Sequence, residues 1–202
     1  KADADARKPY IPSQQVTADK RFYTEYKNNT VAGNDLYAIR KGHIDVPTLV
    51  RIDSTGKETR ISSFASDAGR MWWDEDSKRL YWSETSTDER WSLQTKSKIR
   101  YIEEGSGRKH TVRNSGLLYN PASSHSQIAA TRYEQDGKSF LDLIGSHTGK
   151  TIRSFQAPDS LQILEPVWIG DDIYVTAISD NGYGIYRISI DDNLRAPDGW
   201  KT

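Results

Sequence analysis

A unit of about 42–51 residues recurs along this chain in degraded form, and this period constrains the fold more than any other feature. Each copy ends in a short strand, a turn and a second strand. Glycine lies in the turn of three copies and asparagine in a fourth, at Gly56, Gly107, Gly149 and Asn193. A self-similar all-β period of this length is typical of propeller blades.

The front half of the unit recurs as well, in the segments 71–82, 119–130 and 165–175. A blade is a four-stranded sheet that buries its faces only against neighbouring blades. The sequence therefore predicts an all-β propeller, or a partial propeller of about four four-stranded blades. The alternative β-sandwich would show strands every 8–12 residues without the longer self-similarity.

The repeats suggest where the domain begins. Residues 1–20 are polar and contain two prolines, so we interpret them as a linker or an extended arm. Residues 21–202 are then divided into four approximate blades, at 21–64, 66–114, 116–156 and 162–196. Four blades can close a ring, but no segment is evident that would pair one terminus into the blade of the other. A fragment of a larger propeller is an equally good interpretation.

The composition narrows the class of partner. The 202 residues include 28 acidic and 28 basic ones, and a nucleic-acid binder needs a basic surplus to displace counterions from phosphates. We therefore expect no nucleic-acid partner. We also expect no direct insertion into a membrane, because no run of 18 apolar residues is present. The chain contains no cysteine, which excludes disulfides and thiolate metal sites.

The repeat resembles the WD-like repeat of TolB propellers, over about residues 36–190. The third unit carries the resemblance best, in 120–130, 136–138, 141–144 and 148–150. The segment Trp82–Trp91 is similar to a long hairpin of TolB-like proteins from Bacteroidetes. His125 and Ser126 depart from the pattern, because Asp-Gly is usual there. The resemblance implies a location in the periplasm or at the cell surface of a Gram-negative bacterium.

Most repeat positions have structural roles in this interpretation: tryptophans pack between blades, prolines stiffen strand entries, and glycines close hairpins. These positions are Trp73, Pro121, Pro166, Trp168, Gly56, Gly107 and Gly149. We expect Trp73 and Trp168 to be largely buried at matching positions of their blades.

We predict no catalytic residues, no metal site and no cofactor. The four histidines, His43, His110, His125 and His147, lack metal-binding spacing, and no nucleophile elbow is present. Histidines could still converge from different blades, as in TolB-like lyases that degrade pectin fragments, although solvated turn histidines are the default interpretation.

The candidate binding segment is the hairpin 82–91, which interrupts the repeat and mixes charge with tryptophan. Its candidate residues are Trp82, Asp88, Arg90 and Trp91, because exposed Trp and Arg are favoured interface anchors. In the structural alternative, Trp82 and Trp91 pair across the hairpin and Arg90 bridges a carboxylate.

The sequence thus favours a non-catalytic, TolB-like binding scaffold whose partner is another protein or domain of the cell envelope. The first alternative is a regulatory or substrate-orienting propeller of a larger peptidase. The second is a carbohydrate-processing or carbohydrate-binding propeller, which clustered carboxylates or histidines on the central channel would favour.

Overall fold

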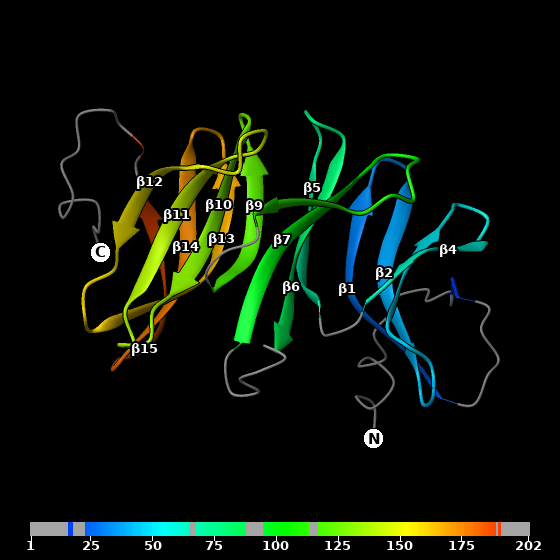
Figure 1. Ribbon diagram of the computed structural model, residues 1–202, viewed down its shortest axis with the longest axis horizontal. Coiled ribbons are helices and arrows are strands. Elements are labelled where there is room, and N and C mark those ends of the chain that lie inside the picture. The colour runs from blue at the N-terminus through cyan, green and yellow to red at the C-terminus, as the bar shows by residue number, and fades with distance from the viewer. Residues whose placement is uncertain are drawn as a thin grey trace, which may run out of the picture.

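The protein is described here from a computed structural model that covers residues 16–17, 23–64, 68–87, 95–113, 117–188 and 190. These residues form antiparallel strands and turns (Figure 1). The prediction of an all-β propeller is confirmed, and the propeller is not closed. Within the described part of the chain, no helix is both long and apolar enough to cross a bilayer.

In the described part of the chain, fifteen strands form four sheets, each built from strands that are consecutive in the sequence. The first sheet contains β1 (Thr24–Ala32), β2 (Asp35–Gly42), β3 (Thr48–Ile52) and β4 (Glu58–Ser63). The second contains β5 (Ala68–Asp74), β6 (Arg79–Thr87), β7 (Thr95–Glu103) and β8 (His110–Arg113). The third contains β9 (Leu118–Ser124), β10 (Gln127–Tyr133), β11 (Ser139–Gly145) and β12 (Thr151–Gln156). The fourth contains β13 (Leu161–Ile169), β14 (Asp172–Ser179) and β15 (Gly182–Ile188).

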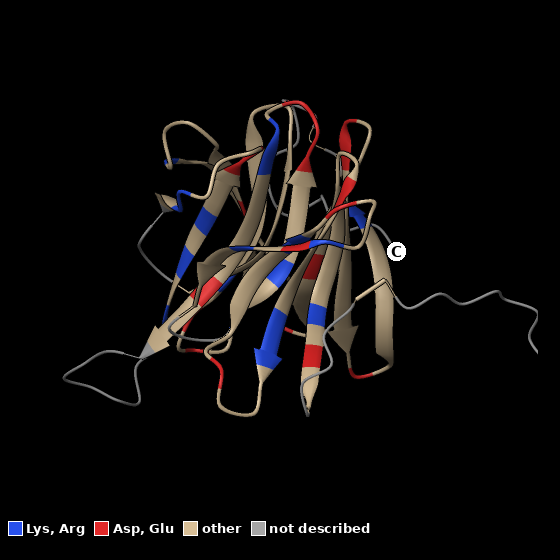
Figure 2. Ribbon diagram, turned by 90° about the vertical axis from the view of Figure 1, so that its right-hand side faces the viewer, with Lys and Arg blue, Asp and Glu red and all other residues tan. Residues whose placement is uncertain are grey.

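The first strands of the four sheets lie side by side. β1 contacts β5, β5 contacts β9, and β9 contacts β13. These strands therefore form the inner row of the propeller, and we call the surface that they present the axial surface. Figure 2 shows both basic and acidic residues on the strands that face the viewer.

The hydrophobic core lies between the sheets. One cluster joins the first and second sheets, with Leu49 and Ile39 facing Leu80 and Trp82. A second joins the second and third sheets, and a third joins the third and fourth. Because alternate residues of a strand point to opposite faces, the second and third sheets each contribute to the clusters on both of their sides. This arrangement is what a fold that buries its blades against one another requires.

The glycines of the outer hairpins make close contacts between sheets. A Cβ atom built on Gly149 would lie 2.3 Å from the carbonyl oxygen of Val112 in β8, and Gly149 has a φ of +64°. In the preceding blade, a Cβ on Gly107 would lie 3.8 Å from the carbonyl oxygen of Ile61 in β4. Gly149 thus lets its outer turn lie close against the outer strand of the blade before it, whereas the turn at Gly107 leaves an ordinary van der Waals distance.

The turn between β9 and β10 explains the departure from the repeat at His125 and Ser126. Ser124 pairs with Gln127, so the loop has two residues, and both have positive φ, at 51° and 60°. A two-residue hairpin turn of this kind normally takes Asn-Gly or Asp-Gly. The chain accepts two side chains in left-handed conformation here.

Candidate functional site

The axial surface is irregular at the same level in all four blades. Each first strand loses register with its neighbour, at residues 28–29, 69–70, 120–121 and 164. In the first three, two residues face one residue of the second strand, which is the pattern of a β-bulge. Bulges bend a strand and re-aim its side chains. They therefore turn polar residues of the inner strands toward the axis and toward the next blade.

Two asparagines join neighbouring bulges. The Asn28 side-chain amide donates to the carbonyl oxygens of Ala68 and Gly69, at 3.0 and 3.3 Å. The Asn120 amide donates to the carbonyl oxygen of Leu164 at 2.9 Å. Both asparagines have φ near +50°, a conformation that asparagine tolerates better than most residues. These bonds fix the first sheet to the second and the third to the fourth.

Packing, rather than backbone conformation, requires a glycine at position 69. A Cβ atom built there would lie 2.4 Å from the hydroxyl oxygen of Ser83, which is buried in β6. The absence of a side chain therefore lets the bulge lie flat against β6. The next residue, Arg70, emerges from the bulge onto the axial surface.

An ion pair crosses this surface. The Arg70 Nη1 lies 3.5 Å from the Glu165 Oε2, so it joins β5 of the second blade to β13 of the fourth. The Arg70 guanidinium also lies 5.4 Å from the ring centroid of Trp72, which is within the range of a cation–π contact. The Trp72 indole donates to the carbonyl oxygen of Ser123 at 2.9 Å, and this bond holds the ring in place.

A pocket of about 330 Å³ opens between β1 and β5 beside this ion pair. Residues 28–31 and 70–73 line it, and they supply amide, hydroxyl and aromatic groups together with one guanidinium. Ligand pockets commonly combine apolar walls with a few polar groups, and this volume lies at the small end of their range. The arrangement can therefore hold a small part of an extended ligand.

Two tyrosines lie close to the same surface. The ring centroids of Tyr119 and Tyr133 are 5.5 Å apart, and the Tyr133 hydroxyl donates to the carbonyl oxygen of Ile163 at 2.6 Å. Burial raises the pKa of both phenols, and the pKa of Tyr133 is raised further by Tyr119 and Glu165. Both hydroxyls are therefore protonated at neutral pH and serve as neutral hydrogen-bonding groups.

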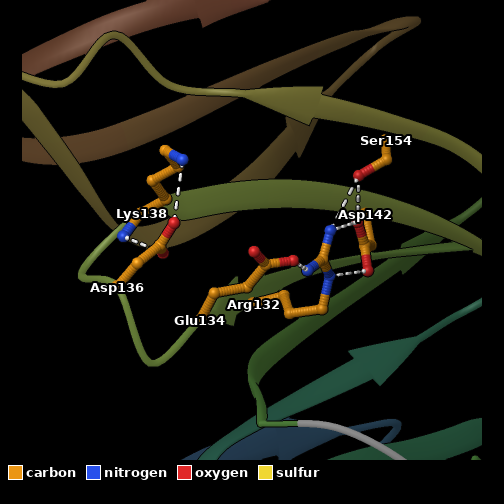
Figure 3. Close-up of polar contacts among 6 residues, drawn as sticks. All are labelled: Arg132, Glu134, Asp136, Lys138, Asp142 and Ser154. Atoms are coloured by element: carbon orange, nitrogen blue, oxygen red, sulfur yellow. Dashed lines mark hydrogen bonds and ion pairs between the residues drawn. The ribbon is translucent and has the colours of Figure 1, made fainter.

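A second polar cluster lies across the third sheet (Figure 3). The Arg132 Nε donates to Asp142 at 2.8 Å, its Nη2 donates to Ser154 at 3.2 Å, and its Nη1 pairs with Glu134. Burial opposes the charge on Arg132, but these acids outweigh it and raise the pKa of the guanidinium. The side chains of this cluster hydrogen-bond and ion-pair with one another across β10, β11 and β12. This network therefore stabilises the sheet rather than offering open ligands.

The histidines do not form a metal site among the described residues, where no three His, Asp or Glu side chains lie close enough to hold an ion. His125 Nδ1 lies 2.9 Å from the Ser124 hydroxyl, and its Nε2 lies 3.5 Å from Asp171. A serine, a histidine and an aspartate also meet in a hydrolytic triad, but there the serine bonds Nε2 and the aspartate bonds Nδ1, so the two ring nitrogens are exchanged here. In addition, the Asp171 side chain is 98% exposed, so water screens its contact with the imidazole. We interpret the contact between His125 and Asp171 as a structural one, where the turn between β9 and β10 meets the turn between β13 and β14.

The structure corrects the prediction for Trp82. Its side chain is 0% exposed and packs edge-on against Phe64, with ring centroids 5.8 Å apart. A ring at the centre of the core cannot contact a partner, so Trp82 leaves the candidate binding set. Asp88, Arg90 and Trp91 lie outside the described residues, and their role in binding stays a prediction.

Trp73 and Trp168 occupy matching register positions, each facing the second residue of the next strand, Leu80 and Ile173. Both are half-buried and pack against the clusters between sheets. The Trp168 indole donates to the carbonyl oxygen of Ala122 at 3.0 Å, in the neighbouring sheet.

Pro121 and Pro166 are buried in the inner strands β9 and β13. Each of these strands is the edge of its own sheet. A proline, which has no N–H to give to a ladder, is tolerated at such an edge.

The comparisons with known proteins concern the fold. No protein-family model matches the chain, and no curated protein matches it either. Among solved structures, a prolyl endopeptidase is similar over 88% of this chain and 28% of its own length, with 16% identity and a TM-score of 0.63. The acylaminoacyl peptidase of Pyrococcus horikoshii is similar over 83% of this chain and 31% of its own, with 13% identity and a TM-score of 0.60.

The propeller domain of the trilobed protease from Pyrococcus furiosus, described as having an open velcro topology, matches 82% of this chain and 55% of its own. Its identity is 11% and its TM-score is 0.58. All these identities are low, so the likeness establishes the propeller fold alone. The chain spans less than a third of the two full-length peptidases and about half of the isolated propeller domain.

Sequence reasoning missed the axial residues Asn28, Arg70 and Glu165. The available signal was weak: Glu165 precedes the proline of the repeat, and Gly69-Arg70 precedes the tryptophans. Asn28 and Arg70 lie in bulges, and Glu165 follows the break in register at residue 164, so their common surface depends on irregularities that the repeat does not show.

Proposed function

We propose that this chain is the propeller part of a larger peptidase, and that its axial surface orients or admits peptide substrates. The observation that carries the proposal is the polar axial surface, where the bulges gather Arg70, Glu165 and a pocket beside Trp72. The likeness to propellers of several peptidases supports the same class. In this proposal the chain itself performs no catalysis, and the hydrolytic groups belong to a separate domain.

The test uses the complete gene product and peptides of different lengths. Asn29 is exposed on β1 at the axial surface, and Asn29→Trp adds bulk there. We expect this variant to lower kcat/KM for long peptides while leaving a short chromogenic substrate unchanged. His147→Trp places the same side chain at an exposed outer turn and serves as the control. A product that cleaves no peptide, or an equal effect of Asn29→Trp on long and short substrates, contradicts the proposal.

A binding scaffold of the cell envelope is the second candidate, and the hairpin of β6 and β7 favours it. These strands pair from Arg79 and Glu103 to Thr87 and Thr95. The pairing with β5 ends at Glu84 and that with β8 begins at Ile99, so the hairpin extends beyond its own sheet. A projecting hairpin is a suitable contact for a partner protein in the envelope. Here the complete gene product would carry no peptidase domain, and Arg90→Ala or Trp91→Ala would reduce partner capture from the native envelope.

A further inference from the structure

The pocket between β1 and β5 has a distinct charge. Among the described residues that line it, Arg70 is the single charged one. Its guanidinium carries five N–H donors in a planar fork, a geometry that matches a carboxylate. Trp72 also lines the pocket, and its ring lies 5.4 Å from the Arg70 guanidinium. The lining therefore attracts an anion that also has an apolar part.

The contact of Arg70 with Glu165 leaves room for such an anion. The two atoms are 3.5 Å apart, and the side chains are 36% and 47% exposed. An exposed ion pair of this length contributes little, so an incoming carboxylate can replace Glu165 at low cost. Glu165 then acts as a competitor that occupies the guanidinium when the pocket is empty.

The polar part of the wall suits a peptide main chain. β1 forms the inner edge of its sheet, and residues 28–29 lie in a bulge outside the regular ladder with β2. Asn29 and Thr30 are among the residues that line the pocket, and their side chains carry an amide and a hydroxyl. A volume of about 330 Å³ admits the end of a chain rather than a long segment.

We propose that this pocket binds the free α-carboxylate of a peptide, with Arg70 as the anchor and the apolar wall receiving the last side chain. This proposal rests on the proposed function, because it names the part of the substrate that the axial surface holds. It makes a prediction of opposite sign for the two members of the ion pair: loss of Arg70 weakens binding, and loss of Glu165 strengthens it.

The experiment measures the Kd of the peptide Ala-Ala-Pro-Phe with a free C-terminus and of the same peptide amidated, by calorimetry and by tryptophan fluorescence. We expect the wild-type protein to prefer the free acid by about tenfold or more, the loss that follows from removing a charged hydrogen bond. Arg70→Gln should abolish this preference. Glu165→Gln should tighten binding of the free acid about threefold or more, because it removes the competitor.

Arg187→Gln is the matched control, since Arg187 pairs with Asp172 at 2.7 Å on β14 and β15, away from the axial strands. It should leave the preference unchanged. Equal binding of the acid and the amide by the wild-type protein overturns the proposal without any variant. Weaker binding of the free acid by Glu165→Gln also overturns it, because the Glu165 carboxylate rather than the Arg70 guanidinium would then hold the ligand. If the complete gene product prefers the free acid but has no peptidase activity, the carboxylate site is supported and only the proposed function is contradicted.

Discussion

The contact between Gly149 and Val112 allows a quantitative test of how the blades are held together. Gly149→Ala adds one methyl group in the turn between β11 and β12. That methyl would lie 2.3 Å from the carbonyl oxygen of Val112 and 3.3 Å from its carbon. The partner is backbone of β8, which cannot rotate away as a flexible side chain can. The turn and β8 must therefore separate.

Two effects set the magnitude. Placing an alanine at a φ of +64° costs about 1–2 kcal/mol, and restriction of the unfolded chain returns about 0.4–1 kcal/mol. Overpacking against a neighbouring element adds about 1–3 kcal/mol. We therefore expect Gly149→Ala to lower the free energy of unfolding by about 1–5 kcal/mol.

Urea denaturation followed by tryptophan fluorescence measures this loss, and two glycines serve as controls. Gly170 has a φ of +60° with no atom within 4 Å of a built Cβ, so Gly170→Ala carries the conformational cost alone, about 1 kcal/mol or less. Gly107 has no positive φ and its nearest atom is 3.8 Å away, so Gly107→Ala should change stability by about 0.5 kcal/mol at most. Equal losses in Gly149→Ala and Gly170→Ala would refute the contact between blades.

Three further outcomes follow from the packing and the hydrogen bonds. Trp168→Ala should lower the free energy of unfolding by about 3 kcal/mol, measured in urea, because the half-buried ring packs on the core between the third and fourth sheets. Asp142→Asn should cost about 1–3 kcal/mol because the buried Asp142 neutralises Arg132, whereas Glu134→Gln should cost about 1 kcal/mol at most; equal losses would argue against the network of Figure 3. The Thr55 hydroxyl, followed by the Lys57 backbone N–H, lowers the pKa of Asp53, so Thr55→Val should raise that pKa in an NMR titration. The stability linked to Asp53 is present above its unfolded pKa and is lost as the pH falls through its lower folded pKa.

The fold class could be predicted because its signals are local. A strand, a turn and a second strand occupy few residues, and their repetition shows that each unit packs on the next. The recurring glycines were predicted as hairpin residues, which covers only part of their role. The contact of Gly149 with β8 joins residues of different blades, and no pattern within one repeat records it.

Trp82 shows a limit of composition as a guide to surfaces. It begins a segment rich in charge and hydroxyl groups, and this context suggested an exposed anchor. The strand β6 runs through the core before it enters the projecting hairpin, so Trp82 lies on the buried part and only the residues beyond Glu84 leave the sheet. The boundary depends on where β5 stops pairing, which is a property of two strands.

The axial surface was beyond sequence reasoning for a related reason. Asn28, Arg70 and Glu165 belong to three repeats and differ in residue type, and an ordinary alternation would direct them to the faces between blades. An extra residue at the same level of each inner strand changes that direction. A bulge conserves the length of the strand to within one residue, so the repeat remains recognisable while its polar side chains turn toward the axis. The same strands therefore have two separate properties. Their packing residues make the repeat recognisable in the sequence, and their bulges place polar residues on the axial surface.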